Sequence, residues 1–292
     1  MPSLALRVGI TAHSTNIPGF VNHPGNGISM FSAENTWILA VVVVAALAIM
    51  LVFLVVRYFQ RSSYTVAQAA LLALAGLFTR YLWRTRVVGF WPIPRGQGAV
   101  IVSNHRCPFD PAFIALAVDR VMRWMVAKEY CEHPFMGFFL RPFGPVPTTR
   151  GGTDTAAVKM IVRYAEQGEI VGLFPEGRIN NTDEFLLPGR PGVAMIALKA
   201  RVPVVPCYIE GAPHNRRWLL GCLLMRARVR VTIGGPIDLS PYYGREGERE
   251  VIEEITKQLL RELARLAGRT DFEPQIAGRF YKSNGNPPDA NG

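Results

Sequence analysis

The sequence predicts an α/β fold, a mixed β-sheet flanked by helices, preceded by an N-terminal membrane-anchoring helical segment. Two patterns favour this class. Short apolar runs ending in Gly/Pro turns alternate with segments of helical periodicity, which is typical of a sheet covered by helices. Ahead of them lies an uncharged stretch of about 20 residues, at positions 37–56. The 292 residues therefore divide into an anchor and one globular domain.

The uncharged stretch is predicted to be a transmembrane helix. About 20 helical residues are enough to cross a hydrocarbon core of about 30 Å. A buried core helix is the alternative, but this run has no polar face to present to water. A removable signal peptide is disfavoured because the run begins late and no small-residue cleavage pattern follows it. A second, shorter apolar stretch at residues 64–79 is expected to be an interfacial helix or a short second span, with the membrane surface favoured.

Charge predicts the orientation of the anchor. Arg7 is the only Lys or Arg before the span, whereas five arginines follow it, at positions 57, 61, 80, 84 and 86. By the positive-inside rule, we expect the N-terminus to lie outside and the globular domain to face the cytoplasm at the inner membrane. The net charge of +10 favours contact with the anionic head groups of a lipid bilayer and with phosphorylated substrates. No nucleic-acid partner is expected, because no nucleic-acid fold signature is present.

Apolar runs and helical periodicity predict the remaining elements along the chain. Expected strands cover residues 98–103, 123–127, 171–174, 202–209 and 226–233. Expected helices cover residues 111–119, 153–167 and 246–266, with a further helix ending at residue 200 and an apolar turn or helix at 135–140. The resulting organisation is a flexible segment (1–36), a membrane anchor (37–86), a catalytic domain (87–270) and a disordered tail (271–292).

The most informative cluster runs from Asn104 to Asp110. His105 and Asp110 are five positions apart, a spacing that points them away from each other on a helix. Pro108 and Pro111 exclude a continuous helix, so we expect a strand end, a tight turn and a helix with Asp110 at its N-cap. Such a turn can fold the carboxylate against the imidazole and leave one ring nitrogen free as a general base. From this segment alone, a helix cap beside a structural histidine fits equally well.

Three further clusters follow downstream. An apolar run ends in Phe174-Pro-Glu-Gly-Arg178, where Gly177 permits a positive φ and Arg178 offers donors suited to phosphate. Arg150 lies in a Gly-rich turn before a predicted helix, and a β-branched run contains Pro206. Each of these has an ordinary structural explanation when taken singly.

In this order, the four clusters resemble those of the glycerolipid acyltransferase family, which includes the 1-acylglycerol-3-phosphate acyltransferases of phospholipid synthesis. The resemblance covers roughly residues 87–239, and four ordered clusters are far more specific than one. It implies that His105 and Asp110 are catalytic. It also implies a set of substrate-binding residues: Arg150, Glu176, Gly177, Arg178 and Pro206. One departure concerns the third cluster, where Ile179 stands in place of the arginine found in many family members, which leaves the acceptor head group open.

The resemblance further implies a membrane-bound O-acyltransferase. It would move a fatty acyl group from acyl-CoA or acyl carrier protein to the free hydroxyl of a lysophospholipid, with 1-acylglycerol 3-phosphate as the expected acceptor. Another lysophospholipid, glycerol 3-phosphate, or a non-catalytic lipid-binding role on the same fold are the alternatives. No cofactor or metal is expected. The four cysteines lack the spacing of a zinc site or a disulfide framework, and Cys107 is not expected to be a nucleophile.

Overall fold

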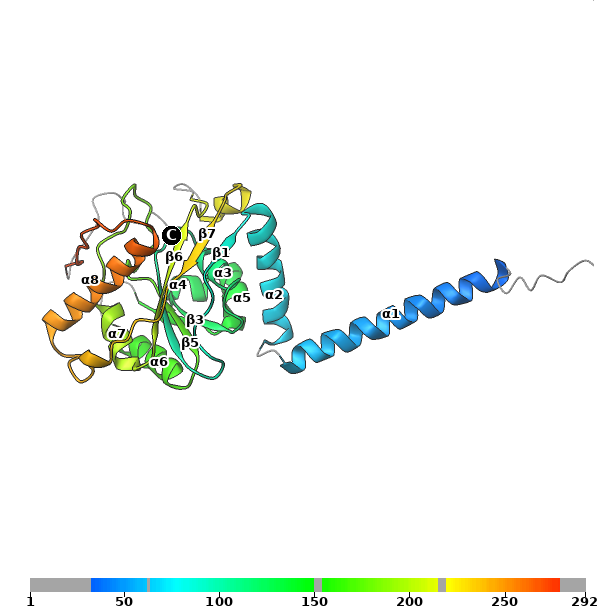
Figure 1. The fold of residues 1–292 in the computed structure, drawn as a ribbon, viewed down its shortest axis with the longest axis horizontal. Coiled ribbons are helices and arrows are strands. Elements are labelled where there is room, and N and C mark those ends of the chain that lie inside the picture. The colour runs from blue at the N-terminus through cyan, green and yellow to red at the C-terminus, as the bar shows by residue number, and fades with distance from the viewer. Residues whose placement is uncertain (1–32, 62–63, 150–153, 215–218, 279–292) are drawn as a thin grey trace, which may run out of the picture. The chain divides into compact units, whose positions relative to one another are not determined.

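The structure, a computed structural model, describes residues 33–61, 64–149, 154–214 and 219–278 (Figure 1). The chain divides into two units, Met1–Arg57 and Tyr58–Gly292. Residues 1–32 and 279–292, most of the segments predicted to be flexible or disordered, lie outside the described residues.

Helix α1 (Ala33–Arg61) contains the predicted span. Its stretch Thr36–Arg57 comprises 22 residues with a mean hydropathy of 3.4, and none of its apolar window is buried within the protein. Alternating Val, Leu, Ile and Ala leave this helix without a polar face. By length and composition, α1 can cross a membrane.

A seven-stranded sheet forms the second unit, in the order β1-β7-β6-β2-β5-β3-β4. Strands β6 and β7 pair antiparallel, and every other neighbouring pair is parallel, so β1 and β7 run against the other five strands. The prediction of a mixed sheet is therefore confirmed. The strands are β1 Arg86–Val88, β2 Ala99–Ser103, β3 Met122–Ala127, β4 Val146–Thr148, β5 Ile170–Leu173, β6 Val204–Glu210 and β7 Arg230–Ile233.

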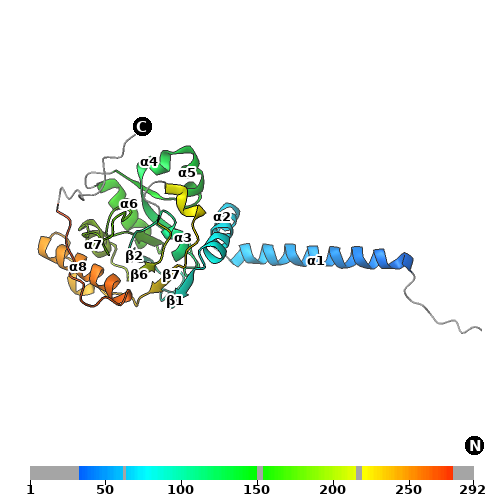
Figure 2. The ribbon, with the colours of Figure 1, turned by 90° about the horizontal axis from the view of Figure 1, so that it is seen from above.

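Helices cover both faces of the sheet (Figures 1 and 2). Consecutive residues of β2 alternate between two cores: Val100 and Val102 pack with α6–α8, whereas Ala99 and Ile101 pack with Trp83 and α3. The remaining elements are α2 Val66–Leu77, η1 Phe78–Leu82, α3 Asp110–Ile114, α4 Lys128–Glu132, α5 Pro134–Leu140, η2 Arg141–Phe143, α6 Thr155–Glu166, α7 Gly192–Ala200, η3 Leu219–Leu224, η4 Ser240–Tyr242 and α8 Arg249–Leu266.

The long helices agree with their predicted periodicity. In α8, the expected apolar stripe is buried, and Gly268 follows with a φ of +74°. Helix α6 begins after Asp154, whose carboxylate accepts a hydrogen bond from the N–H of Ala157 at 3.0 Å. The second apolar stretch is helical as well, since Thr65 and Gln68 form a capping box at the start of α2.

Shorter elements differ from their predictions. The helix predicted over residues 111–119 ends at Ile114, and the strand predicted from residue 226 begins only at Arg230. Part of the segment predicted as a tail is also structured. The ring of Phe272 packs edge-on against Phe185 at 5.2 Å, and Ala277 donates a backbone hydrogen bond to Gly189 at 2.9 Å. Apolar contacts of this kind hold the chain after α8 against the domain.

Candidate active site

The site is built where β2 and β5 end side by side. The two strands pair in parallel, with Val102 opposite Leu173, so the loops that follow them meet at one edge of the sheet. Asn104 fixes the first loop, because its side-chain amide donates to the carbonyl of Ile209 and accepts from the N–H of the same residue, both at 2.8 Å. This pair of bonds extends the β2–β6 pairing by one residue and positions His105 directly after it.

His105 and Asp110 face each other, as their spacing predicted. The Nδ1 atom of the imidazole lies 2.9 Å from Oδ2 of the carboxylate. Asp110 is fully buried, whereas the His105 side chain is 16% exposed. A carboxylate held on Nδ1 favours the tautomer with a proton there, so Nε2 is left as the proton acceptor. The geometry is that of an oriented general base.

Asp110 does not occupy the predicted N-cap position. Helix α3 begins at Asp110 itself, after Phe109, and no side chain caps it. The Oδ2 atom instead also accepts the backbone N–H groups of Arg106 at 2.6 Å and Cys107 at 2.9 Å. These donors belong to the turn, so the carboxylate closes the turn rather than the helix.

An aromatic stack supports the imidazole on one face. The ring of Phe174 is nearly parallel to that of His105, with centroids 3.8 Å apart, and it stacks in turn on Trp124 at 4.7 Å. The stack fixes the plane of the imidazole ring. Sequence reasoning named the cluster containing Phe174 but gave this ring no role, because stacking across 69 positions leaves no local pattern.

Glu176 joins three loops through its carboxylate. It is 2% exposed, and its two oxygens accept the backbone N–H groups of His105 at 2.8 Å and Leu187 at 3.0 Å. Burial raises the pKa of Glu176 to about 7, although both hydrogen bonds oppose that shift. Since both oxygens bind the main chain, Glu176 acts on the site by holding His105 in place.

Arg106 is half-buried and its side chain points to the loop after the third cluster. Its Nη1 atom donates to the carbonyl oxygens of Asn180, Thr182 and Glu184 at 3.0–3.3 Å. The N–H of Asn180 also donates to the carbonyl of His105 at 2.7 Å. Arg106 therefore holds the loop of residues 180–184 against the turn of residues 105–110.

Gly177 has the positive φ that the sequence suggested, at +68°. A Cβ built on it would lie 2.3 Å from Cδ and 2.4 Å from Nε of Arg190, so only glycine lets that side chain cross the turn. Arg190 is exposed, and its backbone N–H donates to the carbonyl of Pro175 at 2.8 Å. No role was predicted for Arg190, although its position between Gly189 and Pro191, in a Gly/Pro loop, was an available signal. Arg178 is half-buried beside the turn.

Two predicted substrate-binding residues are not brought to the site by the described structure. Arg150 lies outside the described residues, which stop at Thr149 and resume at Asp154. Pro206 pairs with Val102 inside the sheet, and its carbonyl accepts the N–H of Gly234 at 2.8 Å. It lies within β6 rather than at the end of that strand, so packing explains it without a ligand.

Cys107 is fully buried within the turn between His105 and Asp110. Burial raises the pKa of its thiol far above the ordinary value, and the negative charge of Asp110 adds to that effect. The reactive thiolate is therefore strongly disfavoured, in agreement with the expectation that Cys107 is no nucleophile.

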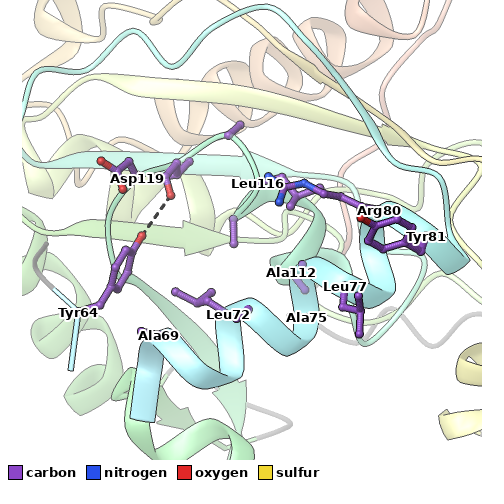
Figure 3. A pocket seen from close by; sticks show the side chains of 15 residues that line it. Tyr64, Ala69, Leu72, Ala75, Leu77, Arg80, Tyr81, Ala112, Leu116 and Asp119 are labelled. Carbon is purple, nitrogen blue, oxygen red and sulfur yellow. Dashed lines mark hydrogen bonds between the residues drawn. The ribbon is translucent and has the colours of Figure 1, made fainter. Parts of the chain in front are cut away.

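A cavity of about 490 Å³ lies between the α2–η1 segment and α3 with the turn after it (Figure 3). Small side chains line much of it, including Ala69, Gly76 and Ala112. Tyr64 lies at one end, where its hydroxyl donates to the carbonyl of Val118 at 3.4 Å, and Arg80 lies at the other. The helix that supplies Asp110 thus also forms one wall of this cavity, whose lining includes the polar side chains of Tyr64, Arg80 and Asp119.

The matches to known proteins cover the part of the chain that contains the four predicted clusters. The family model described as Acyltransferase matches residues 84–210, which include both turns of the site. A 1-acyl-sn-glycerol-3-phosphate acyltransferase of Bacillus subtilis is 23% identical over 180 residues, covering 61% of this chain and 86% of that protein. Tafazzin of Drosophila melanogaster is 26% identical over 180 residues, covering 57% of this chain but only 47% of that protein.

The fold also has a solved counterpart. The crystal structure of the 1-acyl-sn-glycerophosphate (LPA) acyltransferase PlsC from Thermotoga maritima aligns with a TM-score of 0.50 and 21% identity, covering 67% of this chain and 79% of that one. The architecture, the matched model and the named relatives agree with one another. The matched model and the named relatives support an acyltransferase of the glycerolipid acyltransferase family.

Proposed function

We propose that this protein is a membrane-bound enzyme that moves a fatty acyl group from an acyl thioester to the free hydroxyl of 1-acylglycerol 3-phosphate, in phospholipid biosynthesis. The observation that carries the proposal is the 2.9 Å pairing of His105 with buried Asp110 at the edge of the sheet. The names of the Bacillus subtilis relative and of a Brassica napus relative, 27% identical over 158 residues, support this acceptor.

In the proposed reaction, Nε2 of His105 takes the proton from the acceptor hydroxyl as its oxygen attacks the thioester carbonyl. A C–O bond forms, and the tetrahedral intermediate collapses as the C–S bond breaks. The imidazolium then returns its proton to the leaving thiolate. Asp110 keeps the ring oriented and stabilises the imidazolium throughout. No acyl-enzyme forms, so buried Cys107 has no part in the reaction.

The acceptor phosphate would be bound by arginine. Arg178 follows the turn after β5, at the same edge of the sheet as His105, and Arg150 comes two positions after the last residue of β4 in the sequence. The guanidinium group suits bidentate contact with phosphate. Because Ile179 replaces an arginine common in the family, another lysophospholipid or glycerol 3-phosphate is the alternative acceptor.

The cavity between α2 and α3 would receive an acyl chain. Its volume of about 490 Å³ is within the range of about 300–1,000 Å³ typical of small-molecule sites, and alanine, glycine and leucine dominate its lining (Figure 3). A chain bound there would lie against the helix that begins with Asp110. A lining in which alanine and leucine predominate, with Arg80 at one end, supports a lipid acceptor over glycerol 3-phosphate.

Membrane attachment would come from α1 crossing the inner membrane, with the catalytic domain on the cytoplasmic side. The five arginines that follow the apolar span, against Arg7 alone before it, support that orientation. On the cytoplasmic side, either acyl-CoA or acyl carrier protein can serve as donor.

The test is a transferase assay with the full chain in phospholipid vesicles. Labelled acyl-CoA and acyl carrier protein are offered with a panel of lysophospholipids and glycerol 3-phosphate. We expect the highest turnover with 1-acylglycerol 3-phosphate, and its loss in His105→Ala. His133→Asn is the matched control, since His133 is an exposed histidine that caps α5 away from the paired residues. Equal turnover by the wild type and His105→Ala would defeat the mechanism.

A further inference from the structure

The side chain of Arg190 lies across the turn of residues 174–178. A Cβ built on Gly177 would lie 2.3 Å from Cδ and 2.4 Å from Nε of this arginine, far closer than side chains pack. Gly177 also has a φ of +68°, which other residues adopt only with strain. The path of the arginine therefore depends on the absence of a side chain at position 177.

The backbone at Arg190 is held in place from two sides. Its N–H donates to the carbonyl of Pro175 at 2.8 Å, and the carbonyl of the preceding Gly189 accepts the N–H of Ala277 at 2.9 Å. Gly189 also packs so closely on α8 that a Cβ there would lie 2.8 Å from the side chain of Thr256. The side chain of Arg190 therefore starts from a fixed point, which limits the region that its guanidinium can reach.

Arg190 is exposed, and it has no anionic partner within the part of the chain that the structure describes. Other exposed arginines do pair, as Arg249 does with Glu253 on α8 at 2.7 Å. The carboxylate of Glu176, in the turn that Arg190 crosses, is occupied by backbone N–H groups at 2.8 and 3.0 Å. A guanidinium positioned by its backbone and without a protein anion is available to an anionic ligand.

The turn that Arg190 crosses is the one that positions the base. The N–H of Gly177 donates to the carbonyl of Phe174 at 3.0 Å, which closes the turn. The ring of Phe174 stacks on His105 with centroids 3.8 Å apart, and Glu176 accepts the N–H of His105 at 2.8 Å. An anion bound by Arg190 would therefore lie beside the residues that hold the imidazole.

We propose that Arg190 is a substrate-binding residue whose guanidinium binds a phosphate group. The inference rests on the proposed function, which supplies two such groups: the phosphate of 1-acylglycerol 3-phosphate, and that of the phosphopantetheine arm carried by both candidate donors. Arginine suits phosphate because its planar fork of donors makes bidentate contact. Arg178 follows Gly177 directly, so a second guanidinium belongs to the same turn. In this arrangement Gly177 acts through Arg190, by leaving its path open.

Two substitutions test the proposal as a pair in the full chain, in phospholipid vesicles. Arg190→Ala removes the guanidinium. Gly177→Ala should displace it, because the new methyl group meets only the far end of a flexible side chain. Gly268→Ala is the matched control, since Gly268 also has a positive φ, of +74°, but a Cβ there has no neighbour within 4 Å. The KM values for acceptor and donor are measured separately.

We expect Arg190→Ala to raise the KM for one of the two substrates about tenfold with kcat nearly unchanged, because a charge-assisted contact is lost. Gly177→Ala should raise the same KM, and it should add little in the Arg190→Ala background. Arg190→Lys should restore part of the affinity, since it keeps the charge but loses the fork. Gly268→Ala should leave both KM values unchanged.

The substrate whose KM rises identifies the phosphate. If it is the acceptor, turnover of monoacylglycerol, which has no phosphate, should be insensitive to Arg190→Ala. If it is the donor, turnover of acyl-pantetheine, which also lacks the phosphate, should be insensitive. Unchanged KM values for both substrates, or an equal loss with the phosphate-free analogue, would overturn the proposal. Additive effects of the two substitutions would show that Gly177 does not act through Arg190.

Equilibrium binding of labelled 1-acylglycerol 3-phosphate and of CoA is measured on the same proteins, so that the two proposals fail separately. Turnover with 1-acylglycerol 3-phosphate, with equal binding and equal KM values for the wild type and Arg190→Ala, overturns the inference and leaves the proposed function intact. Weaker binding of either ligand by Arg190→Ala, without turnover of any acceptor by the wild type, supports phosphate binding at Arg190 and overturns the proposed function.

Discussion

The turn that holds His105 and Asp110 and the cavity between α2 and α3 both include residues of helix α3, but different interactions determine their shapes. In the turn, buried carboxylates of Asp110 and Glu176 each accept at least two hydrogen bonds at fixed distances. In the cavity, small residues such as Ala69, Gly76 and Ala112 leave space and form no directional contacts through their side chains. Removing one hydrogen-bonding partner in the turn leaves a buried polar group unpaired, whereas adding a methyl group in the cavity changes only its shape. Under the proposed function, the first region would decide whether the reaction proceeds, and the second would decide which acyl chain fits.

The largest effect should come from removing the base. We expect His105→Ala to lower kcat at least about 100-fold, since positioned general bases contribute about 10²–10⁴-fold. Acceptor KM should change little, because the imidazole acts mainly in the transition state. Steady-state kinetics in vesicles, with His133→Asn as the control, measures this. A variant that keeps wild-type kcat would show that the turn is structural.

The carboxylate of Glu176 should make stability depend on pH. Its pKa is raised by burial to about 7 in the folded protein, against about 4.5 when exposed. The unfolded chain therefore releases this proton first, and the folded state loses stability as pH rises from about 4.5 to about 7. The loss should approach about 3 kcal/mol, from about 1.4 kcal/mol per unit of pKa difference.

Glu176→Gln isolates this contribution, because glutamine stays neutral at every pH. Thermal unfolding of the two proteins in the same detergent should show the wild type losing stability relative to the variant between about pH 4.5 and 7. Above that range the difference should be constant. Parallel pH profiles for the two proteins would mean that Glu176 keeps an ordinary pKa.

Arg150→Ala should have a smaller effect, confined to the acceptor. Loss of a charge-assisted contact of about 1.5–3 kcal/mol should raise the KM for 1-acylglycerol 3-phosphate about tenfold or more and leave kcat nearly unchanged. Arg163→Ala, at an exposed position on α6, is the control. A fall in kcat at constant KM would show that Arg150 does not bind the acceptor phosphate.

Filling the cavity should give the smallest effect. A Cβ on Gly76 has no neighbour within 4 Å, so Gly76→Phe can be accommodated and would project into open space. We expect the preference among substrates to shift toward shorter acyl chains by a few-fold, with turnover of the shortest chains retained. Competition between long- and short-chain substrates measures the ratio. An unchanged ratio would mean that acyl chains bind elsewhere.

The sequence predicted what depends on neighbours along the chain. His105 and Asp110 are five residues apart, so their pairing follows from one proline-containing turn. The apolar span of α1, the stripe of α8 and the cap of α6 are likewise local patterns. The mixed sheet could also be predicted from the sequence, because alternation of short strands and helices restricts the connections that can form.

Only tertiary structure decided which distant groups hold the turn of His105 and Asp110 in place. The carboxylate of Glu176 reaches the backbone of His105 across 71 positions, and Arg106 reaches carbonyls more than 70 positions away. Backbone donors and acceptors are present at every residue, so composition and periodicity do not indicate which of them a buried side chain will meet.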